Sequence, residues 1–221
     1  MSKEAKESYD QTYGSDTFCL GISGIIGTGK TTLARDLAKH LGARVSEEQV
    51  ETNDYLPLFY KDMQKYSFPM QIDMLTRRFA LHQQMVWSGQ NTIQDRTIYE
   101  DVIFAKMQRD SGHMDEMFFQ TYRKLFVNTM SNFLHSPDLI VYLDCTPEVA
   151  LERVKLRARE YESALTVDFL TQLQQGYEEW LTAVEPRIPV LRLDWNEFRS
   201  TQEVAESVQM KLSEIKGNLI I

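Results

Sequence analysis

The chain has 221 residues, of which 43% are hydrophobic and 25% are charged, and its formal net charge at pH 7 is −8. This length and composition suit one α/β domain, and the acidic balance does not favour a nucleic-acid-binding protein. No apolar stretch approaches the roughly 20 residues that a membrane-spanning helix needs. We therefore expect no membrane partner and a cytoplasmic location.

Residues 1–16 are polar and mixed in charge. They have neither the apolar core of a secretory signal nor the arginine-rich, acid-poor character of a transit peptide. We expect them to form a flexible N-terminal tail and residues 17–221 to form a single domain.

The first predicted strand, Thr17–Ser23, leads directly into the octet GIIGTGKT. The octet fits the P-loop pattern G-x-x-x-x-G-K-[ST], in which backbone N–H groups surround a polyphosphate. Leucines at helical spacing then predict a helix over Lys30–Leu41, whose N-terminus adds to such an anion site. In this arrangement Lys30 reaches the β- and γ-phosphates of ATP, and the Thr31 hydroxyl can bind Mg²⁺. The residues expected to bind ATP here are Gly24, Ile25, Ile26, Gly27, Thr28, Gly29, Lys30, Thr31 and Thr32.

Strand-like and helical patterns alternate along the rest of the chain. Such alternation predicts an α/β fold with a five-stranded parallel sheet covered by helices on both faces, and ligands bind beyond the carboxyl ends of its strands. The further predicted strands are Ala43–Glu47, Thr92–Asp95, Leu139–Asp144 and Val190–Asp194. The further predicted helices are Met70–Ser88, Glu100–Gln108, Glu116–Phe133, Pro147–Arg157, Asp168–Ala183 and Thr201–Lys211.

Carboxylates follow the second predicted strand, where Glu47 and Glu48 precede Gln49 and Val50. A carboxylate beside the P-loop can accept the proton of a hydroxyl that is being phosphorylated. We assign this role to Glu48, although Glu47 is also acidic and the assignment depends on register. By composition alone, a solvated acidic loop is an equally good interpretation.

The third predicted strand ends in Asp95-Arg96-Thr97. An arginine there can contact a transferring phosphoryl group, and an aspartate can hold Mg²⁺ or its water. The alternative is a surface ion pair, which a neighbouring P-loop disfavours.

Gln71 and Arg78 are seven residues apart in a helical segment and so share one face, whereas Arg77 does not. A glutamine amide presents a donor and an acceptor together, which suits the edge of a nucleobase. Taken alone, a glutamine at this position would more often be an ordinary surface residue.

Three arginines, Arg153, Arg157 and Arg159, occur in the segment LERVKLRARE. On an acidic protein they suggest a lid that grips phosphates. The alternative is a solvated helix face on which Glu152 or Glu160 pairs with them.

These motifs, in this order, resemble the deoxyribonucleoside kinases, the family of deoxycytidine, deoxyguanosine and deoxyadenosine kinases. The matching patterns are the P-loop, E-[QP]-V at Glu48, F-x-x-Q at Gln71, D-R-[ST] at Asp95 and R-x-R at Arg157. The likeness runs from about residue 18 to residue 183. It is strongest to the deoxyadenosine and deoxyguanosine kinases of bacterial type.

The resemblance implies a role for each matching residue. Around the reacting groups, Glu48 would activate the 5′-hydroxyl, Arg96 would lie near the 5′-position and Asp95 near Mg²⁺. On the donor side, Arg157 and Arg159 would hold the phosphates, and Arg153 would pack near the adenine. On the acceptor side, Tyr60 would bind the sugar 3′-hydroxyl with Glu162 as its carboxylate partner, Gln71 would read the base, Arg78 and Asp101 would line the base end, and Phe104 would stack on the base.

The activity implied is transfer of the γ-phosphoryl group of ATP, with Mg²⁺, to the 5′-hydroxyl of a deoxyribonucleoside, preferably deoxyadenosine or another purine. The resemblance also implies a homodimer. A thymidylate kinase would carry an E-P-G-G-type loop after the second strand, and a GTPase switch would carry N-K-x-D; the sequence has neither. A non-catalytic P-loop protein that only binds nucleotides remains an alternative, since a sequence does not report turnover.

Overall fold

The computed structural model describes residues 17–47, 52–128, 130–159, 162 and 165–218. Within these residues, five parallel strands form one sheet in the order β2-β3-β1-β4-β5. The strands are β1 Cys19–Ser23, β2 Arg44–Ser46, β3 Thr92–Asp95, β4 Leu139–Asp144 and β5 Val190–Asp194. The predicted α/β fold is thus confirmed, while residues 1–16, expected to be a flexible tail, lie outside the described part of the chain.

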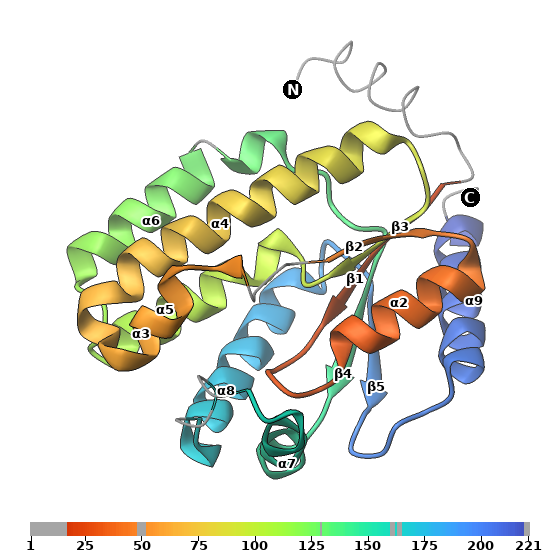
Figure 1. Cartoon of the computed structure of the whole chain (residues 1–221). Helices are drawn as coiled ribbons and strands as arrows, with labels where there is room; N and C mark the ends of the chain where they lie inside the picture. The colour runs from red at the N-terminus through yellow and green to blue at the C-terminus, as the bar shows by residue number, and fades with distance from the viewer. Residues whose placement is uncertain (1–16, 48–51, 129, 160–161, 163–164, 219–221) are drawn as a thin grey trace.

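Helices cover both faces of the sheet. The helices of the described chain are α2 Lys30–Leu41, α3 Tyr55–Lys61, α4 Met63–Ser88, α5 Asp101–Asp110, α6 Glu116–Asn128, α7 Pro147–Arg157, α8 Val167–Val184 and α9 Thr201–Asn218, with 3₁₀ turns η2 Ile98–Glu100 and η3 Met130–Phe133. Figure 1 shows α2 and α9 on one side of the sheet and α4, α5 and α8 on the other. No described helix is long and apolar enough to span a membrane.

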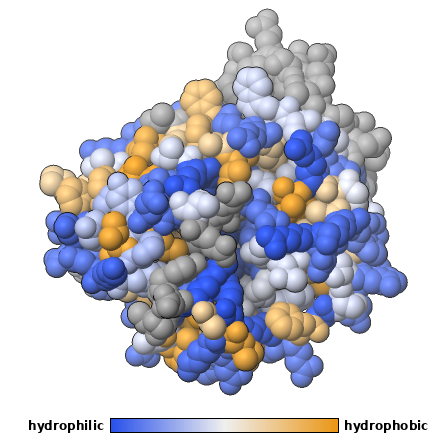
Figure 2. All heavy atoms as spheres, in the orientation of Figure 1, coloured by the Kyte–Doolittle hydropathy of each residue, from blue (hydrophilic) through white to orange (hydrophobic). Residues whose placement is uncertain are grey.

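The core forms where the central strands meet these helices. Strand β1 and nearly all of β4 are buried, as expected for parallel strands covered on both faces. Leu33 and Leu37 of α2 pack on one face, and Leu173 and Tyr177 of α8 belong to the same buried cluster. On the surface shown in Figure 2, hydrophilic residues predominate, and hydrophobic residues occur in small groups among them.

Two helices differ from the sequence-based expectation. Helix α3 was not predicted, and α4 begins at Met63 instead of Met70, with Pro69 inside it. Proline lacks an N–H and usually begins or breaks a helix. The sequence pattern therefore did not indicate that α4 extends back from Pro69 to Met63. The Asp62 side chain caps this turn by accepting from the Lys65 N–H at 3.0 Å.

Other differences concern the ends of elements. Strand β2 lies at the edge of the sheet, pairs with β3 and has three residues in place of the predicted five. The predicted helix Glu116–Phe133 ends at Asn128, and a 3₁₀ turn follows after residue 129, which lies outside the described residues.

Gly21 of β1 brings the loop after β3 close to the sheet. A Cβ atom at Gly21 would lie only 2.2 Å from the Thr97 methyl group. Glycine therefore lets the Asp95-Arg96-Thr97 segment pack directly against the strand that leads into the P-loop.

Candidate active site

A cavity of about 810 Å³ opens at the carboxyl ends of β1 and β3. It lies between the P-loop on one side and α3, α4 and α5 on the other, the expected position for a ligand in a parallel sheet. Its walls bring together most of the residues predicted from the sequence. These are Ile26, Gly27, Gly29, Lys30, Thr31, Thr32, Tyr60, Gln71, Arg78, Asp95, Arg96, Asp101, Phe104, Arg153, Arg157, Arg159 and Glu162.

The P-loop has the backbone shape that anion binding requires. Gly24, Gly27 and Gly29 have φ values of 148°, 94° and 82°, a region open to glycine. A Cβ at Gly27 would lie 2.4 Å from the carbonyl oxygen of Ala150, so the loop also packs tightly on α7. Successive N–H groups can therefore turn toward the space where a phosphate would lie.

Lys30 is the cation of this loop. Its ammonium group is buried and donates to the carbonyl of Ile25 at 2.6 Å and to the Thr28 hydroxyl at 3.2 Å. Burial, followed by the charge of Arg96, lowers the pKa of Lys30 well below its usual value. An arriving polyphosphate would offset both effects, because it supplies negative charge at this point.

Thr31 and Asp95, the two predicted metal ligands, are in direct contact. The Thr31 hydroxyl donates to a carboxylate oxygen of Asp95. In the part of the chain that the structure describes, no group of three or more His, Cys, Asp or Glu side chains gathers to hold a metal. A metal at Thr31 and Asp95 would therefore complete its shell with phosphate oxygens and water, as Mg²⁺ commonly does.

Arg96 lines the cavity at the end of β3. Its backbone is left-handed, with φ 68°, and one guanidinium nitrogen lies 3.2 Å from a carboxylate oxygen of Glu100. The same nitrogen donates to the Tyr177 hydroxyl, and the guanidinium lies 4.9 Å from the centre of the Phe104 ring. The side chain is thus fixed on several sides, beside both the P-loop and Phe104.

The predicted base-reading residues meet at the end of the cavity formed by α4 and α5. Arg78 and Asp101 form an ion pair, and their side chains are only 6% and 1% exposed. Gln71 is buried on the same face of α4, and Phe104 lies one turn beyond Asp101 on α5. These four residues give this end of the cavity a hydrogen-bonding wall and an aromatic surface.

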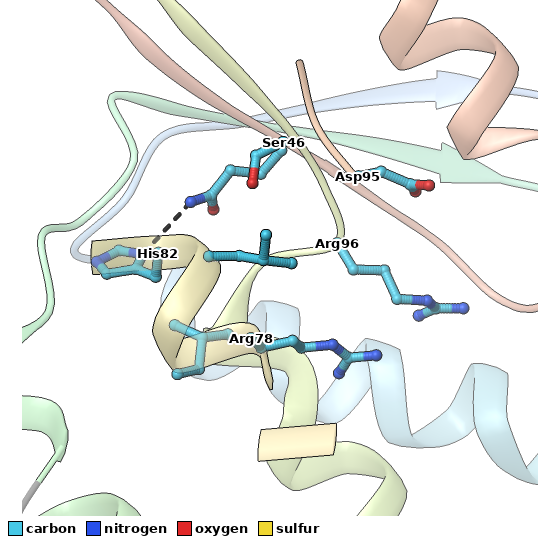
Figure 3. Close-up of a pocket in the computed structure, with 8 residues that line it drawn as sticks. Ser46, Arg78, His82, Asp95 and Arg96 are labelled. Carbon is cyan, nitrogen blue, oxygen red and sulfur yellow. Dashed lines mark hydrogen bonds between the residues drawn. The ribbon is translucent and has the colours of Figure 1, made fainter. Parts of the chain in front are cut away.

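Behind Arg78 and Arg96 lies a small polar space of about 10 Å³, lined also by Ser46, His82 and Gln94. Figure 3 shows Arg78, Asp95 and Arg96 pointing to the same side, away from His82. His82 is bonded at both ring nitrogens, to the Gln94 amide at 3.3 Å and to the His135 N–H at 3.0 Å. Burial, and then the nearby His135, lower the pKa of His82 to about 4. The ring is therefore neutral, and its bonds connect α4 to Gln94 and His135.

The segment after α7 carries the predicted lid. Helix α7 ends at Arg157, and Ala158 is left-handed with φ 53°. Arg157 donates through two nitrogens to the buried carboxylate of Glu162, the shorter contacts measuring 2.6 Å, and Arg159 lies 3.6 Å from the same group. The alternative interpretation was a solvated helix face on which Glu152 or Glu160 pairs with these arginines. Glu160 lies outside the described residues.

Comparisons with known proteins identify the family. Residues 20–215 match the family described as Deoxynucleoside kinase. The chain belongs to the deoxynucleoside kinase family. This match sets aside the thymidylate kinase and GTPase alternatives.

Two curated deoxynucleoside kinases are similar over most of the chain. The deoxyadenosine kinase of Dictyostelium discoideum is 44% identical over 197 residues, which is 89% of this chain and 80% of the relative. The deoxyadenosine/deoxycytidine kinase of Bacillus subtilis (strain 168) is 35% identical over 89% of this chain and 93% of the relative.

Solved structures agree. The deoxyadenosine kinase from M. mycoides with bound dCTP superposes with a TM-score of 0.79 at 31% identity, over 89% of this chain and 99% of that one. The same enzyme with bound dATP gives a TM-score of 0.78. The chain is therefore a deoxynucleoside kinase in both sequence and fold.

The residue assigned as the base of this deoxynucleoside kinase, Glu48, lies outside the described residues, as do Gln49 and Val50. Its neighbour Glu47 is described and is engaged elsewhere. Arg35 donates to Glu47 through Nε at 2.6 Å and through a second nitrogen, and these bonds lower the pKa of Glu47. A carboxylate held by an arginine is a poor proton acceptor, which favours Glu48 over Glu47.

One wall of the kinase cavity was not predicted. Phe198, in the loop after β5, lines the cavity with its ring 4.0 Å beneath the Arg153 guanidinium. Arg153 also donates to the Asn196 carbonyl at 2.8 Å, and the Trp195 indole donates to the Thr28 carbonyl of the P-loop at 2.8 Å. The signal available in the sequence was an aromatic residue shortly after a strand, but the family likeness ended at residue 183.

Proposed function

We propose that this kinase transfers the γ-phosphoryl group of ATP to the 5′-hydroxyl of deoxyadenosine, with other deoxynucleosides as poorer acceptors. The observation that carries the proposal is a single cavity that joins a P-loop to a buried polar wall of Gln71, Arg78 and Asp101. Adenine presents a donor and an acceptor side by side, which one glutamine amide can match. The similar proteins named above include deoxyadenosine kinases, which supports the same choice.

On the donor side, we assign the phosphates to the P-loop, Lys30, Arg157 and Arg159. Arg153 and Phe198 form a stacked pair next to Gly29, which gives a flat surface for the adenine of ATP. Thr31 and Asp95 supply the oxygen ligands that Mg²⁺ prefers, and the ion when bound neutralises charge on the phosphates.

On the acceptor side, we assign the sugar to Tyr60 and Glu162, both of which line the cavity. Glu48 takes the proton from the 5′-hydroxyl, and Arg96 stabilises the charge of the transferring group. The base lies between Phe104 and the opposite wall, with Gln71 on its edge and the Arg78–Asp101 pair at its end.

We further propose that the enzyme is a homodimer. Large hydrophobic side chains are exposed on neighbouring helices: Trp87 on α4, and Met117, Phe118 and Val127 on α6. Helices α4 and α6 pack side by side, so these residues can contribute to one apolar face that a second copy would cover. The mass of the protein in solution tests this proposal.

A steady-state assay with ATP, Mg²⁺ and each of the four deoxynucleosides tests the function. We expect the highest kcat/KM for deoxyadenosine and the lowest for thymidine, because the polar wall matches an amino-bearing base. Lys30→Met serves as the control, since loss of activity in this variant ties the turnover to the P-loop. A native enzyme that prefers thymidine would contradict the proposed base recognition, and a protein without turnover would be a binding protein.

The lid arginines should act on the donor. We expect Arg157→Ala or Arg159→Ala to lower kcat/KM for ATP strongly, which corresponds to a loss of about 2–4 kcal/mol of transition-state stabilisation. The affinity for deoxyadenosine, measured by calorimetry, should change much less. Arg187→Ala is the matched control, because Arg187 is exposed and does not line the cavity. If both lid variants keep the kinetics of Arg187→Ala, the two arginines belong to a solvated helix face.

A further inference from the structure

Glu100 is a buried carboxylate to which the sequence patterns gave no role. It is fully shielded from solvent, at the end of η2, and both of its oxygens are bonded. One oxygen accepts from the Ser23 hydroxyl at 2.9 Å and from the Thr97 N–H at 2.7 Å. The other accepts from Arg96 at 3.2 Å and from the Tyr177 hydroxyl.

These contacts join three parts of the chain that meet at the reacting groups. Ser23 is the last residue of β1 and directly precedes the P-loop, whereas Arg96 follows β3 and Tyr177 belongs to α8. Glu100 therefore connects the start of the donor loop to the arginine that faces the acceptor. Tyr177, also fully buried, bonds to both Glu100 and the same nitrogen of Arg96, which closes a three-membered network.

Arg96 has particular need of such support. A non-glycine residue with φ 68° is uncommon and persists only where its surroundings hold it. An arginine side chain also has many rotamers, and a wrong rotamer would carry the guanidinium out of the cavity. Glu100 and Tyr177 both bond to one guanidinium nitrogen of Arg96, and they thereby restrict its backbone and its side chain.

The network also balances charge. Lys30 and Arg96 are close enough that Arg96 lowers the pKa of the buried Lys30, while Glu100 acts in the opposite direction. Two cations converging on one site repel each other until phosphate arrives, so a fixed carboxylate nearby makes the empty site less costly to form.

We propose that Glu100, with the Tyr177 hydroxyl, is a positioning group that holds the Arg96 guanidinium at the transferring phosphoryl group. The role rests on the proposed function, because it acts on the reaction only through Arg96. It is distinct from the capping box that Glu100 also forms with Thr97 at the start of η2.

The substitution Glu100→Gln separates the two roles. Glutamine serves in a capping box as well as glutamate does, so the bonds from Ser23 and Thr97 can remain. Its NH₂ group then faces the Arg96 guanidinium, where two donors meet and the ion pair is lost. Tyr177→Phe keeps the ion pair of Glu100 with Arg96 but removes the hydroxyl that accepts from Arg96 and donates to Glu100. Tyr142→Phe is the matched control, because Tyr142 is a buried tyrosine whose ring centre lies 5.8 Å from that of Tyr177.

We expect Glu100→Gln to lower kcat by about 10- to 100-fold, since small misplacements of a catalytic group have effects of this order. Tyr177→Phe should lower kcat by about 3- to 10-fold on the same principle. KM for ATP and for the nucleoside should stay near their native values in both variants. The melting temperature should fall no further than in Tyr142→Phe.

The decisive measurement compares Arg96→Ala with the double variant Arg96→Ala, Glu100→Gln. If Glu100 acts through Arg96, the second change should not lower kcat further, because the group that it positions is gone. An equal drop in both backgrounds, an unchanged kcat in Glu100→Gln, or a loss explained by unfolding would each overturn the positioning role. The native enzyme is measured on all four deoxynucleosides in parallel. Absence of turnover there would remove the proposed function itself, and this role with it.

Discussion

We expect Glu48→Gln to lower kcat by a factor on the order of 10²–10⁴, which is the usual contribution of a general base. The glutamine keeps the size and shape of the side chain but cannot accept the proton of the 5′-hydroxyl. ATP affinity should be preserved, since the P-loop and the lid arginines are intact. Single-turnover kinetics together with a nucleotide-binding measurement separate the two effects.

Glu47→Gln is the matched control for this prediction. Glu47 is bonded to Arg35 on α2, so its loss should mainly loosen that surface contact, which contributes little to stability. We expect kcat to remain within a few-fold of native in this variant, as is usual for an exposed ion pair. If Glu47→Gln abolishes turnover and Glu48→Gln does not, the base is one residue earlier than assigned.

The second large effect should come from the ion pair at the base end of the cavity. We expect the double variant Arg78→Met, Asp101→Ala to admit thymidine and to weaken the use of deoxyadenosine. The ratio of kcat/KM for thymidine to that for deoxyadenosine should rise by a factor on the order of 10²–10⁴, because polar sites discriminate strongly by their hydrogen bonds. The pair can present fixed donors to a purine, whereas apolar replacements accommodate the 5-methyl group of thymine.

Both residues must change together. Removing one member of a buried pair leaves an uncompensated charge, whereas replacing both with apolar groups is often neutral for stability. The control is the double variant Arg77→Met, Asp73→Ala. It removes a neighbouring ion pair of α4, whose closest atoms are 2.6 Å apart and which does not line the cavity. Kinetics with all four deoxynucleosides decide the matter. A double variant that keeps the native ranking would show that this pair does not set base choice.

The parts of the fold that could be predicted were those with strong local patterns. The P-loop and α2 follow from glycine spacing and leucine periodicity, and β1 and β4 follow from short apolar runs. The first turns of α4 were missed because Pro69 lies inside that helix, and the seven-residue α3 was missed because it is short and contains Pro57. In such places contacts outside the segment decide the structure, and a single sequence does not contain them.

Some residues of the candidate site could likewise be predicted from local patterns, and others could not. Residues at strand ends, such as Asp95 and Arg96, could be predicted because parallel strands present their carboxyl ends at one edge. The family resemblance supplied Tyr60 and Glu162, which no pattern singled out. Glu100 and Tyr177 lie 77 residues apart, and neither the spacing nor the resemblance indicated that they bond to each other. Phe198 was missed for a related reason, because it lies beyond the matched stretch.

The contact between Arg157 and Glu162 has a consequence for how ATP enters the site. A carboxylate that accepts two bonds from a guanidinium occupies the same fork that a phosphate would use, so Glu162 imitates part of the ligand. If Arg157 binds the donor phosphates as we propose, a phosphate must replace Glu162 as its partner, and this contact adds to the ATP affinity only the difference between the two interactions. In return, the arginine is kept folded over the cavity instead of free in water, and less disorder has to be lost when the nucleotide arrives.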